Sequence, residues 1–354
     1  MIDQSISEQL QNQVQQASDN REPLRIIGSG SKNFLGRDTA GVTLNLSQHR
    51  GIVDYDPREL VLTARGGTPL AEIEQVLAES NQMLAFEPPY FGDNATLGGT
   101  IASGLSGPRR PYSGSGRDYV LGCKLLNGKA EILNLGGRVI KNVAGYDLSR
   151  LMAGAFGTLG VLLEVSLKVL PKPAASITLI HESSQAAAID YMSKLLSRSL
   201  PVDGACYYAG HCYVRLSGSA QSVKETQRKL SGDVVHDAHH FWERLREHQL
   251  PFFEQSLPLW RIAIKPATPP LPISGGWLLD WGGGQRWLMS DAAPELIHQN
   301  ARGQNGHATL FRGGDRSADV FQPLVPAMLA LQQRIKASFD PCAILNPGRI
   351  YAAI

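Results

Sequence analysis

The chain has 354 residues, of which 43% are hydrophobic and 19% are charged, a composition typical of a soluble globular protein large enough for two cores. The 34 Lys and Arg residues against 32 Asp and Glu leave a formal charge of +2, which argues against a broad nucleic-acid-binding surface. The four cysteines form no CxxC pair, so a structural zinc site or an iron–sulfur cluster held by this chain is not expected.

The first half of the chain predicts helices and strands in alternation. Apolar residues recur every fourth position from Ile6 to Val14, as in an amphipathic helix. Residues 70–82 predict a second helix, with Thr68 as its N-cap and Pro69 in its first turn. Strands are expected at 24–27, 41–47, 59–67 and 161–170, a hairpin at 118–137 with a tight turn at Asn127-Gly128, and a short helix at 148–152.

Residues 88–117 are rich in Gly, Ser, Thr and Pro and read as one long loop. A loop of this length within a compact domain is usually functional. The sequence PKPA at 171–174 predicts the main domain boundary, because two prolines in four residues interrupt regular structure.

The second half predicts an α+β layout that is partly antiparallel. Strands are expected at 176–182, 206–218, 259–266, 276–281 and 285–290, and helices at 184–200, 221–230, 239–250 and 325–339. An extended tail, DPCAILNPGRIY, follows at 340–351.

Three glycine-rich segments stand at ends of predicted strands or starts of helices: GSGSK from Gly28, TLGGT from Thr96 and GTLG from Gly157. The first fails the dinucleotide pattern GxGxxG, because Asn33 stands where the third glycine belongs. Glycine lets backbone N–H groups approach a diphosphate closely, so three such segments together indicate a diphosphate-containing cofactor. Each segment alone is weak evidence and favours an ordinary turn, because glycine turns are common.

The motifs GSGSKNFLG, ATLGGTIASGLSG, RDYVLG and VIKNVAGYDLSRLMAGAFGTLGVLLEVSLKV resemble the successive motifs of the vanillyl-alcohol-oxidase, or PCMH-type, FAD-binding domain. The tail FDPCAILNPGRI is similar to the C-terminal segment of the 2-hydroxy-acid dehydrogenase branch of that family. The likeness covers residues 24–170 and 339–351 and is weak in between.

The resemblance implies an α+β protein with an FAD-binding domain of two α/β subdomains and an α+β cap domain over the isoalloxazine ring. The FAD-binding domain is expected at residues 1–172 with its subdomains divided near residue 50, the cap at 173–320, and a returning C-terminal helix and tail at 321–354.

The resemblance also implies which residues hold FAD. The pyrophosphate would lie along Gly28, Ser29, Gly30, Ser31, Lys32 and Asn33. The pyrophosphate and ribityl chain would lie beside Ala95, Thr96, Leu97, Gly98, Gly99, Ala102 and Ser103. The adenine-side half or the flavin edge would contact Gly157, Thr158, Gly160 and Val161. Some relatives tether FAD through a histidine in the first loop; none lies between Gly28 and Gly36, so non-covalent FAD is expected.

Oxidation of a 2-hydroxy acid requires a hydride acceptor, which is the flavin, a base for the hydroxyl proton and a cation for the carboxylate. Arg109, Arg110 and Arg312 are candidates for the cation, since a guanidinium binds a carboxylate bidentately. Solvated loop arginines are the alternative reading.

His307 is the candidate base, because catalytic relatives carry a histidine in a strand near this place. In those relatives a second histidine follows seven residues later, and a Glu-His-Gly segment follows downstream; together they ligate a metal that binds the substrate. Here Gly314 occupies the second position and no Glu-His-Gly follows, so no metal site is expected and the usual base is in doubt.

The resemblance therefore implies an FAD-dependent oxidoreductase subunit of the glycolate-oxidase kind, acting on glycolate or another small 2-hydroxy acid. Its expected partners are a larger flavoprotein subunit and an iron–sulfur subunit, without nucleic acid. The alternatives are a non-catalytic electron-relay or assembly subunit and, third, an FAD-dependent reductase of a sugar nucleotide. The polar N-terminus predicts a cytoplasmic location, with attachment to the inner face of the membrane through partners as an alternative.

Overall fold

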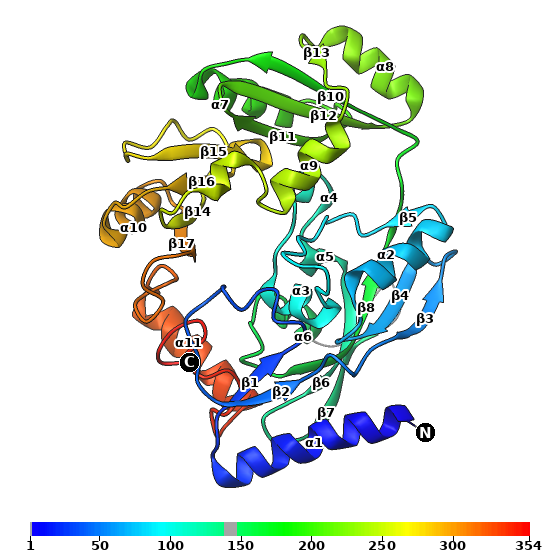
Figure 1. Cartoon of the computed structure of the whole chain (residues 1–354), viewed down its shortest axis with the longest axis vertical. Coiled ribbons are helices and arrows are strands. Elements are labelled where there is room, and N and C mark those ends of the chain that lie inside the picture. Colours follow the sequence, from blue (N-terminus) through cyan, green and yellow to red (C-terminus); the bar gives the residue numbers. More distant parts are fainter. Residues whose placement is uncertain (1, 138–146) are drawn as a thin grey trace. The chain divides into compact units, whose positions relative to one another are not determined.

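The computed structural model describes residues 2–137 and 147–354 and divides into two compact units (Figure 1). Unit 1 consists of Met1–Leu105, Ser115–Pro171 and Arg316–Ile354. Unit 2 consists of Ser106–Gly114 and Lys172–Asp315. The main change of unit falls within the predicted PKPA boundary at 171–174, and the short segment Ser106–Gly114 belongs to unit 2 although unit 1 surrounds it in sequence.

A small parallel sheet opens unit 1. It pairs β1 (Leu24–Ile27) with β2 (Val42–Asn45), and α1 (Ile2–Asn20) precedes it. Leu10 and Val14 of α1 are buried in one hydrophobic cluster with residues of both strands, so the predicted amphipathic helix uses its apolar face for this core.

The larger sheet of unit 1 is antiparallel throughout. Its strands are β3 (Ile52–Asp56), β4 (Val61–Arg65), β8 (Val161–Lys168), β6 (Val120–Leu126) and β7 (Ile132–Gly136), in that spatial order. Both faces of β8 are buried, because Leu162 and Val165 belong to one core and Val161 and Leu163 to the other. The pairing of β8 with β6 shifts in register between Leu162 and Glu164. Leu162 and Val165, which strict alternation would place on opposite faces, can therefore reach the same core.

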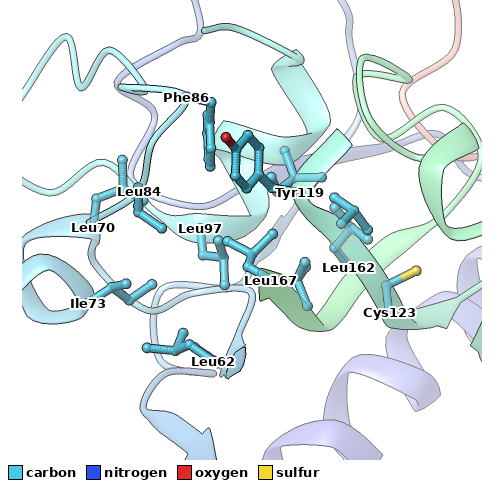
Figure 2. Close-up of a cluster of buried hydrophobic side chains, with 14 of the residues drawn as sticks. Leu62, Leu70, Ile73, Leu84, Phe86, Leu97, Tyr119, Cys123, Leu162 and Leu167 are labelled. Atoms are coloured by element: carbon cyan, nitrogen blue, oxygen red, sulfur yellow. The ribbon is translucent and has the colours of Figure 1, made fainter. Parts of the chain in front are cut away.

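Short helices cover one face of this sheet. They are α2 (Leu70–Glu79), α3 (Leu97–Ser103), α5 (Gly116–Tyr119) and α6 (Leu148–Leu151). Leu70, Ile73 and Leu77 of α2 are spaced to form one helical face and are fully buried. Figure 2 shows this core, where the rings of Phe86 and Tyr119 lie with their centroids 5.6 Å apart.

The C-terminal segment completes unit 1. Helix α11 (Pro326–Phe339) carries Lys336, whose buried ammonium donates to Asp340 Oδ2 and to the carbonyls of Thr158 and Leu345, each at 2.7 Å. Leu345 forms a parallel bridge with Leu24 of β1. The tail therefore connects α11 with the third glycine-rich segment and with the strand that leads into the first. The pair β5 (Gln82–Met83) and β9 (Leu170–Pro171) is a further short sheet.

Unit 2 is built on an eight-stranded antiparallel sheet. Its strands in spatial order are β13 (Asp233–Val234), β10 (Ala175–Glu182), β12 (His211–Gly218), β11 (Val202–Tyr208), β15 (Gly276–Asp280), β16 (Gln285–Met289), β14 (Leu259–Ala263) and β17 (His307–Arg312). Its helical segments are α4 (Arg110–Ser113), α7 (Gln185–Leu196), α8 (Ala220–Lys229), α9 (Ala238–Arg246), η1 (Pro251–Glu254), η2 (Trp281–Gly283) and α10 (Pro294–Gly303). The antiparallel sheets and segregated helices confirm the predicted α+β class.

Four local predictions are corrected. Helix α2 has Pro69, not Thr68, as its N-cap, because the Thr68 hydroxyl accepts from the backbone N–H of Gly51 at 2.9 Å and donates to the Gly51 carbonyl at 3.1 Å. The predicted tight turn at Asn127-Gly128 is a longer loop, in which Asn127 Oδ1 accepts from the backbone N–H groups of Lys129 and Glu131.

The predicted strand 206–218 is two strands, β11 and β12, joined at Ala209-Gly210, where both residues have positive φ. The predicted loop 88–117 contains α3 and α4 and the start of α5, because Thr96 caps α3 by accepting from Gly99 N–H at 3.3 Å and Ser115 forms a capping box with Asp118. Small and polar residues favour caps as well as loops, and the sequence pattern did not separate the two.

Candidate functional site

A cavity of about 370 Å³ lies in unit 1 where β1 ends in the first glycine-rich loop, a volume within the range of small-molecule sites. The whole first predicted loop lines it, together with four residues of the second glycine-rich segment and α3. The lining residues predicted from sequence are Gly28, Ser29, Gly30, Ser31, Lys32, Asn33, Thr96, Gly99, Ala102 and Ser103.

An adjoining cavity of about 80 Å³ shares residues with the first and adds the third glycine-rich segment. Gly28 and Thr96 line both cavities, and Gly98, Gly157 and Gly160 line the second. The three glycine-rich segments therefore come together in space, as a diphosphate-containing cofactor would require.

The glycines in these loops make room for close backbone approach. A Cβ on Gly28 would lie 2.3 Å from Oγ1 of Thr96. A Cβ on Gly157 would lie 2.8 Å from Nδ2 of Asn346, and the φ of Gly157 is +72°, which favours glycine. A side chain at either position would displace a neighbour that itself lines the cavities.

Four predicted cofactor residues lie behind the cavity walls. Ala95, Leu97 and Val161 are buried in the hydrophobic cores of unit 1, and the buried Thr158 hydroxyl donates to the carbonyl of Ala155 at 2.7 Å. They support the glycine-rich segments, since each is next or close in sequence to a residue that does line a cavity. The conspicuous motif KNVAGY at 141–146 lies outside the described residues.

Several cavity residues were missed by the sequence analysis. They are Arg25, Ile26, Ile27, Asp38, Thr39, Phe156, Asn346 and Arg349. Asn346 and Arg349 belong to the ILNPGRI tail, so the similarity of that tail to a family segment was the signal that could have placed them. Arg25 precedes the first loop by three residues, in a strand that reads as apolar.

Asn346 links the segments that form the cavity. Its Oδ1 accepts from the backbone N–H of Ile26 at 2.8 Å, and its Nδ2 donates to the carbonyl of Phe156 at 2.6 Å. Its backbone N–H donates to the carbonyl of Leu24 at 3.0 Å. One side chain thus holds β1 against the third glycine-rich segment.

Arg349 holds the far end of the first loop. Its Nη2 donates to the carbonyl of Asn33 at 2.9 Å and its Nη1 to the carbonyl of Arg37 at 3.0 Å. Burial, with repulsion from Arg316 and Arg25 and partial compensation by Asp38, lowers the pKa of Arg349 to about 10.

The arginine candidates of unit 2 have partners of their own. Arg109 forms an ion pair with Asp203 at 2.6 Å, and both side chains are largely buried. The guanidinium of Arg110 lies 4.4 Å from the ring centroid of Trp281, a cation–π contact. Arg312 ends β17 and is close enough to His248 to lower the pKa of that buried imidazole.

Arg261 stands out among the arginines of unit 2, although nothing in the sequence pattern singled it out. It lies in β14 opposite Thr309 of β17, two positions along β17 from His307, so all three side chains share one face of the sheet. In the part of the chain that the structure describes, no hydrogen bond or ion pair engages the guanidinium of Arg261. Burial and repulsion from Arg110 lower its pKa to about 10.

His307 lies in the field of these cations. Partial desolvation, Arg261 and Arg110 together lower the pKa of His307 below its ordinary value of 6.5. The imidazole is therefore neutral at pH 7, the state in which it can accept a proton.

Within residues 2–137 and 147–354, His, Cys, Asp and Glu side chains do not gather in threes in a way that could hold a metal ion. Of the helices in these ranges, none combines the length and the apolar character needed to cross a membrane.

Comparison with known proteins identifies relatives along the whole chain. Residues 5–136 match the family model described as an FAD binding domain. The chain is 49% identical over 348 residues to glycolate oxidase subunit GlcE of Escherichia coli (strain K12), and the match covers 98% of each chain. It is 33% identical over 190 residues to glycolate oxidase subunit GlcD of Bacillus subtilis (strain 168), which covers 52% of this chain and 40% of the relative.

Among solved structures, the fold is similar to that of p-cresol methylhydroxylase with substrate bound. The TM-score is 0.71 at 16% sequence identity, and the match covers 97% of this chain and 87% of the other. This likeness and the matched family model confirm the predicted PCMH-type fold. The family model and the relatives confirm FAD as the cofactor.

Proposed function

The chain belongs to the family of glycolate oxidase subunit GlcE, and on that premise we propose that it is the FAD-binding subunit of an enzyme complex that oxidises glycolate to glyoxylate. The observation that carries the proposal is the cavity at which the three glycine-rich segments meet, in a chain that is similar to that relative over almost its whole length. Unit 1 would bind FAD, and unit 2 would act as the cap that binds substrate.

The residues of unit 1 fit FAD. The cavity is lined by glycines, of which Gly28 leaves no room for a side chain, by several hydroxyl groups and by three cationic side chains. Bound FAD would supply the hydride acceptor. Because the first loop has no histidine, the cofactor would be held without a covalent bond.

Unit 2 offers a carboxylate-binding cation and a base on one sheet face. Arg261 would hold the carboxylate of glycolate, because its guanidinium has no competing partner in the described part of the chain. His307 would accept the hydroxyl proton, since its lowered pKa keeps it neutral at pH 7. Arg110 would add positive charge, whereas Arg109 is committed to Asp203 and Arg312 ends the strand farther along.

The proposed partners are a larger flavoprotein subunit and an iron–sulfur subunit. A second candidate function, an electron-relay or assembly subunit without its own oxidation step, is favoured by Gly314, which stands where catalytic relatives were expected to have their second histidine.

One experiment separates the two candidates. The purified chain, loaded with FAD, is mixed with glycolate or D-lactate under anaerobic conditions while the flavin absorbance is recorded. Bleaching by glycolate supports substrate oxidation by this chain. A flavin that stays oxidised in the chain alone but is reduced in the assembled complex supports the relay role. A flavin that stays oxidised in both, while the partner's flavin is reduced, supports the assembly role.

A further inference from the structure

The FAD cavity carries an uneven set of charges beside the first loop. Arg25, Lys32 and Arg349 contribute three positive charges to its lining, and Asp38 contributes one negative charge. Lys32 donates to the carbonyl of Tyr90 at 3.1 Å, which directs its ammonium to the backbone. The lining therefore holds more cationic than anionic groups before any ligand is considered.

Unlike Lys32 and Arg349, Arg25 does not donate a side-chain hydrogen bond to a backbone carbonyl in the described part of the chain. Its Nε is buried, and in the described ranges 2–137 and 147–354 its guanidinium makes no hydrogen bond or ion pair. The Oγ1 of Thr39, which lines the same cavity, is likewise buried and unbonded within those ranges. Buried polar groups are nearly always hydrogen-bonded in native proteins, so two exceptions facing one cavity point to a ligand that satisfies them.

Arg349 provides the contrast. Its guanidinium donates to the carbonyls of Asn33 and Arg37, so it is used in holding the loop. Arg25 repels it, and that repulsion contributes to the lowered pKa of Arg349. Arg25 is thus unfavourable for its neighbour in the absence of an anion, and a bound anion would remove the repulsion.

We propose that the Arg25 guanidinium, assisted by the Thr39 hydroxyl, binds the diphosphate of FAD and is the main charge partner of that group in this chain. The inference rests on the proposed function, because it assigns residues to the FAD cavity. A planar guanidinium matches the paired oxygens of a phosphate, and the glycine-rich loop of the same cavity lets the backbone approach the same group. Arg25 is a binding residue whose electrostatic strain is relieved by the cofactor.

The test compares full-length wild type with Arg25→Met and, as a matched control, with Arg58→Met, an exposed arginine of unit 1 outside the cavity lining. The dissociation constant of FAD is measured by flavin fluorescence at low and high salt, and the melting temperature of each flavin-free protein is recorded.

We expect Arg25→Met to weaken FAD binding by about 10- to 100-fold, the range for lost hydrogen bonds to a charged group. The salt dependence of FAD binding should decrease, because one charge pair is missing. The flavin-free melting temperature should stay equal or rise, since the repulsion of Arg349 is removed. Arg58→Met should leave all three quantities unchanged.

An FAD dissociation constant of Arg25→Met within about twofold of the wild-type value would overturn the inference, because a lost hydrogen bond to a charged group has a larger effect. So would a clear fall in the melting temperature of the flavin-free variant, because it would make Arg25 a structural residue. A wild-type chain that takes up no FAD would instead overturn the proposed function, which the wild-type titration detects by itself.

Discussion

Gly28 illustrates how single residues shape the cavity. The backbone of Gly28 has an ordinary φ, so its requirement for glycine comes from space alone: a Cβ would lie 2.3 Å from Oγ1 of Thr96. We expect Gly28→Ala to lower the free energy of unfolding by about 1–3 kcal/mol, the usual penalty of overpacking, and to weaken FAD binding. Urea unfolding and FAD titration measure the two effects.

The clash provides its own control. Thr96→Ala removes the hydroxyl, so the double variant Gly28→Ala/Thr96→Ala should recover part of the loss, a coupling that a double-mutant cycle detects. Gly303→Ala, where the new methyl group would meet nothing within 4 Å, should be neutral or slightly stabilising. Strictly additive effects of the two substitutions would contradict the contact.

In the proposed function, substrate binding depends on Arg261. We expect Arg261→Met to raise the glycolate concentration needed for half-maximal flavin reduction by about 10- to 100-fold, because a charge-assisted hydrogen bond is lost. The rate of flavin reduction is measured against glycolate concentration in the FAD-loaded protein, or in the complex. Arg302→Met, an exposed arginine of α10, is the control. An unchanged concentration dependence in Arg261→Met would remove Arg261 from the site.

His248 predicts how stability changes with pH. Its imidazole stacks on Phe253 with ring centroids 4.0 Å apart, and burial, Arg312 and Arg261 hold its pKa well below 6.5. As pH falls through 6.5 the unfolded chain binds a proton that the folded chain does not, so acid destabilises the fold until the folded pKa is reached. This group contributes at most about 1.4 kcal/mol per pH unit.

His248→Phe keeps an aromatic ring in the cluster and removes the titration. Urea unfolding between pH 7 and pH 5 should therefore show a shallower loss of stability in the variant than in wild type. His307, whose pKa is also lowered, remains in both proteins and cancels in the comparison. Parallel pH profiles would show that His248 does not contribute.

The glycines that the sequence singled out line two adjoining cavities, and few other residues permit such close contacts. Sequence reasoning missed Arg25 and Arg261, since an arginine within an apolar strand looks the same whether it meets solvent, a carboxylate or a ligand. Their burial and partners are properties of the folded chain and have no local signature.

Among the elements, the tail around Asn346 has the widest influence on the cavity. The φ of Asn346 is +43°, so Asn346→Gly removes the side chain without adding backbone strain. Loss of its bonds to the Ile26 N–H and the Phe156 carbonyl should lower the free energy of unfolding by about 2–4 kcal/mol, because two backbone groups lose their partner. FAD affinity should fall as well, since β1 and the third glycine-rich segment are no longer held together.

Chemical denaturation and FAD titration of Asn346→Gly test this role. Ser338→Gly, at an exposed position of α11 whose hydroxyl donates to the carbonyl of Arg334, serves as the control for a glycine substitution in the same segment. Equal effects of the two variants on FAD affinity would contradict a specific role of Asn346.

Elements with long periodic patterns were predicted close to their observed bounds, as for α2 and the hairpin β6–β7. The prediction of a single strand at 206–218 was wrong, because residues typical of strands flank Ala209-Gly210 on both sides. The turn is recognised only from the positive φ angles of these two residues. Helix α10 was not predicted, since its short amphipathic pattern lies between two loops.

For the whole molecule, the important property is that unit 1 is assembled from three parts of the chain. All three glycine-rich segments precede residue 172, but Asn346 and Arg349 of the same cavity come from the end of the sequence. We expect a chain truncated after Phe339 to bind FAD at least about 100-fold more weakly, or not at all. This is roughly the effect of losing the hydrogen bonds of both Asn346 and Arg349. Equilibrium dialysis with FAD measures this, and uptake equal to that of the full chain would contradict the role of the tail.

The proposed function requires that the full-length chain holds one FAD, without a covalent bond, in the cavity of unit 1. The most direct measurement is the absorbance spectrum of the purified chain after incubation with FAD and removal of the excess, followed by acid precipitation. We expect a yellow protein with one FAD per chain and all the flavin in the acid supernatant. A colourless protein that takes up no FAD, or flavin that remains with the precipitate, would contradict it.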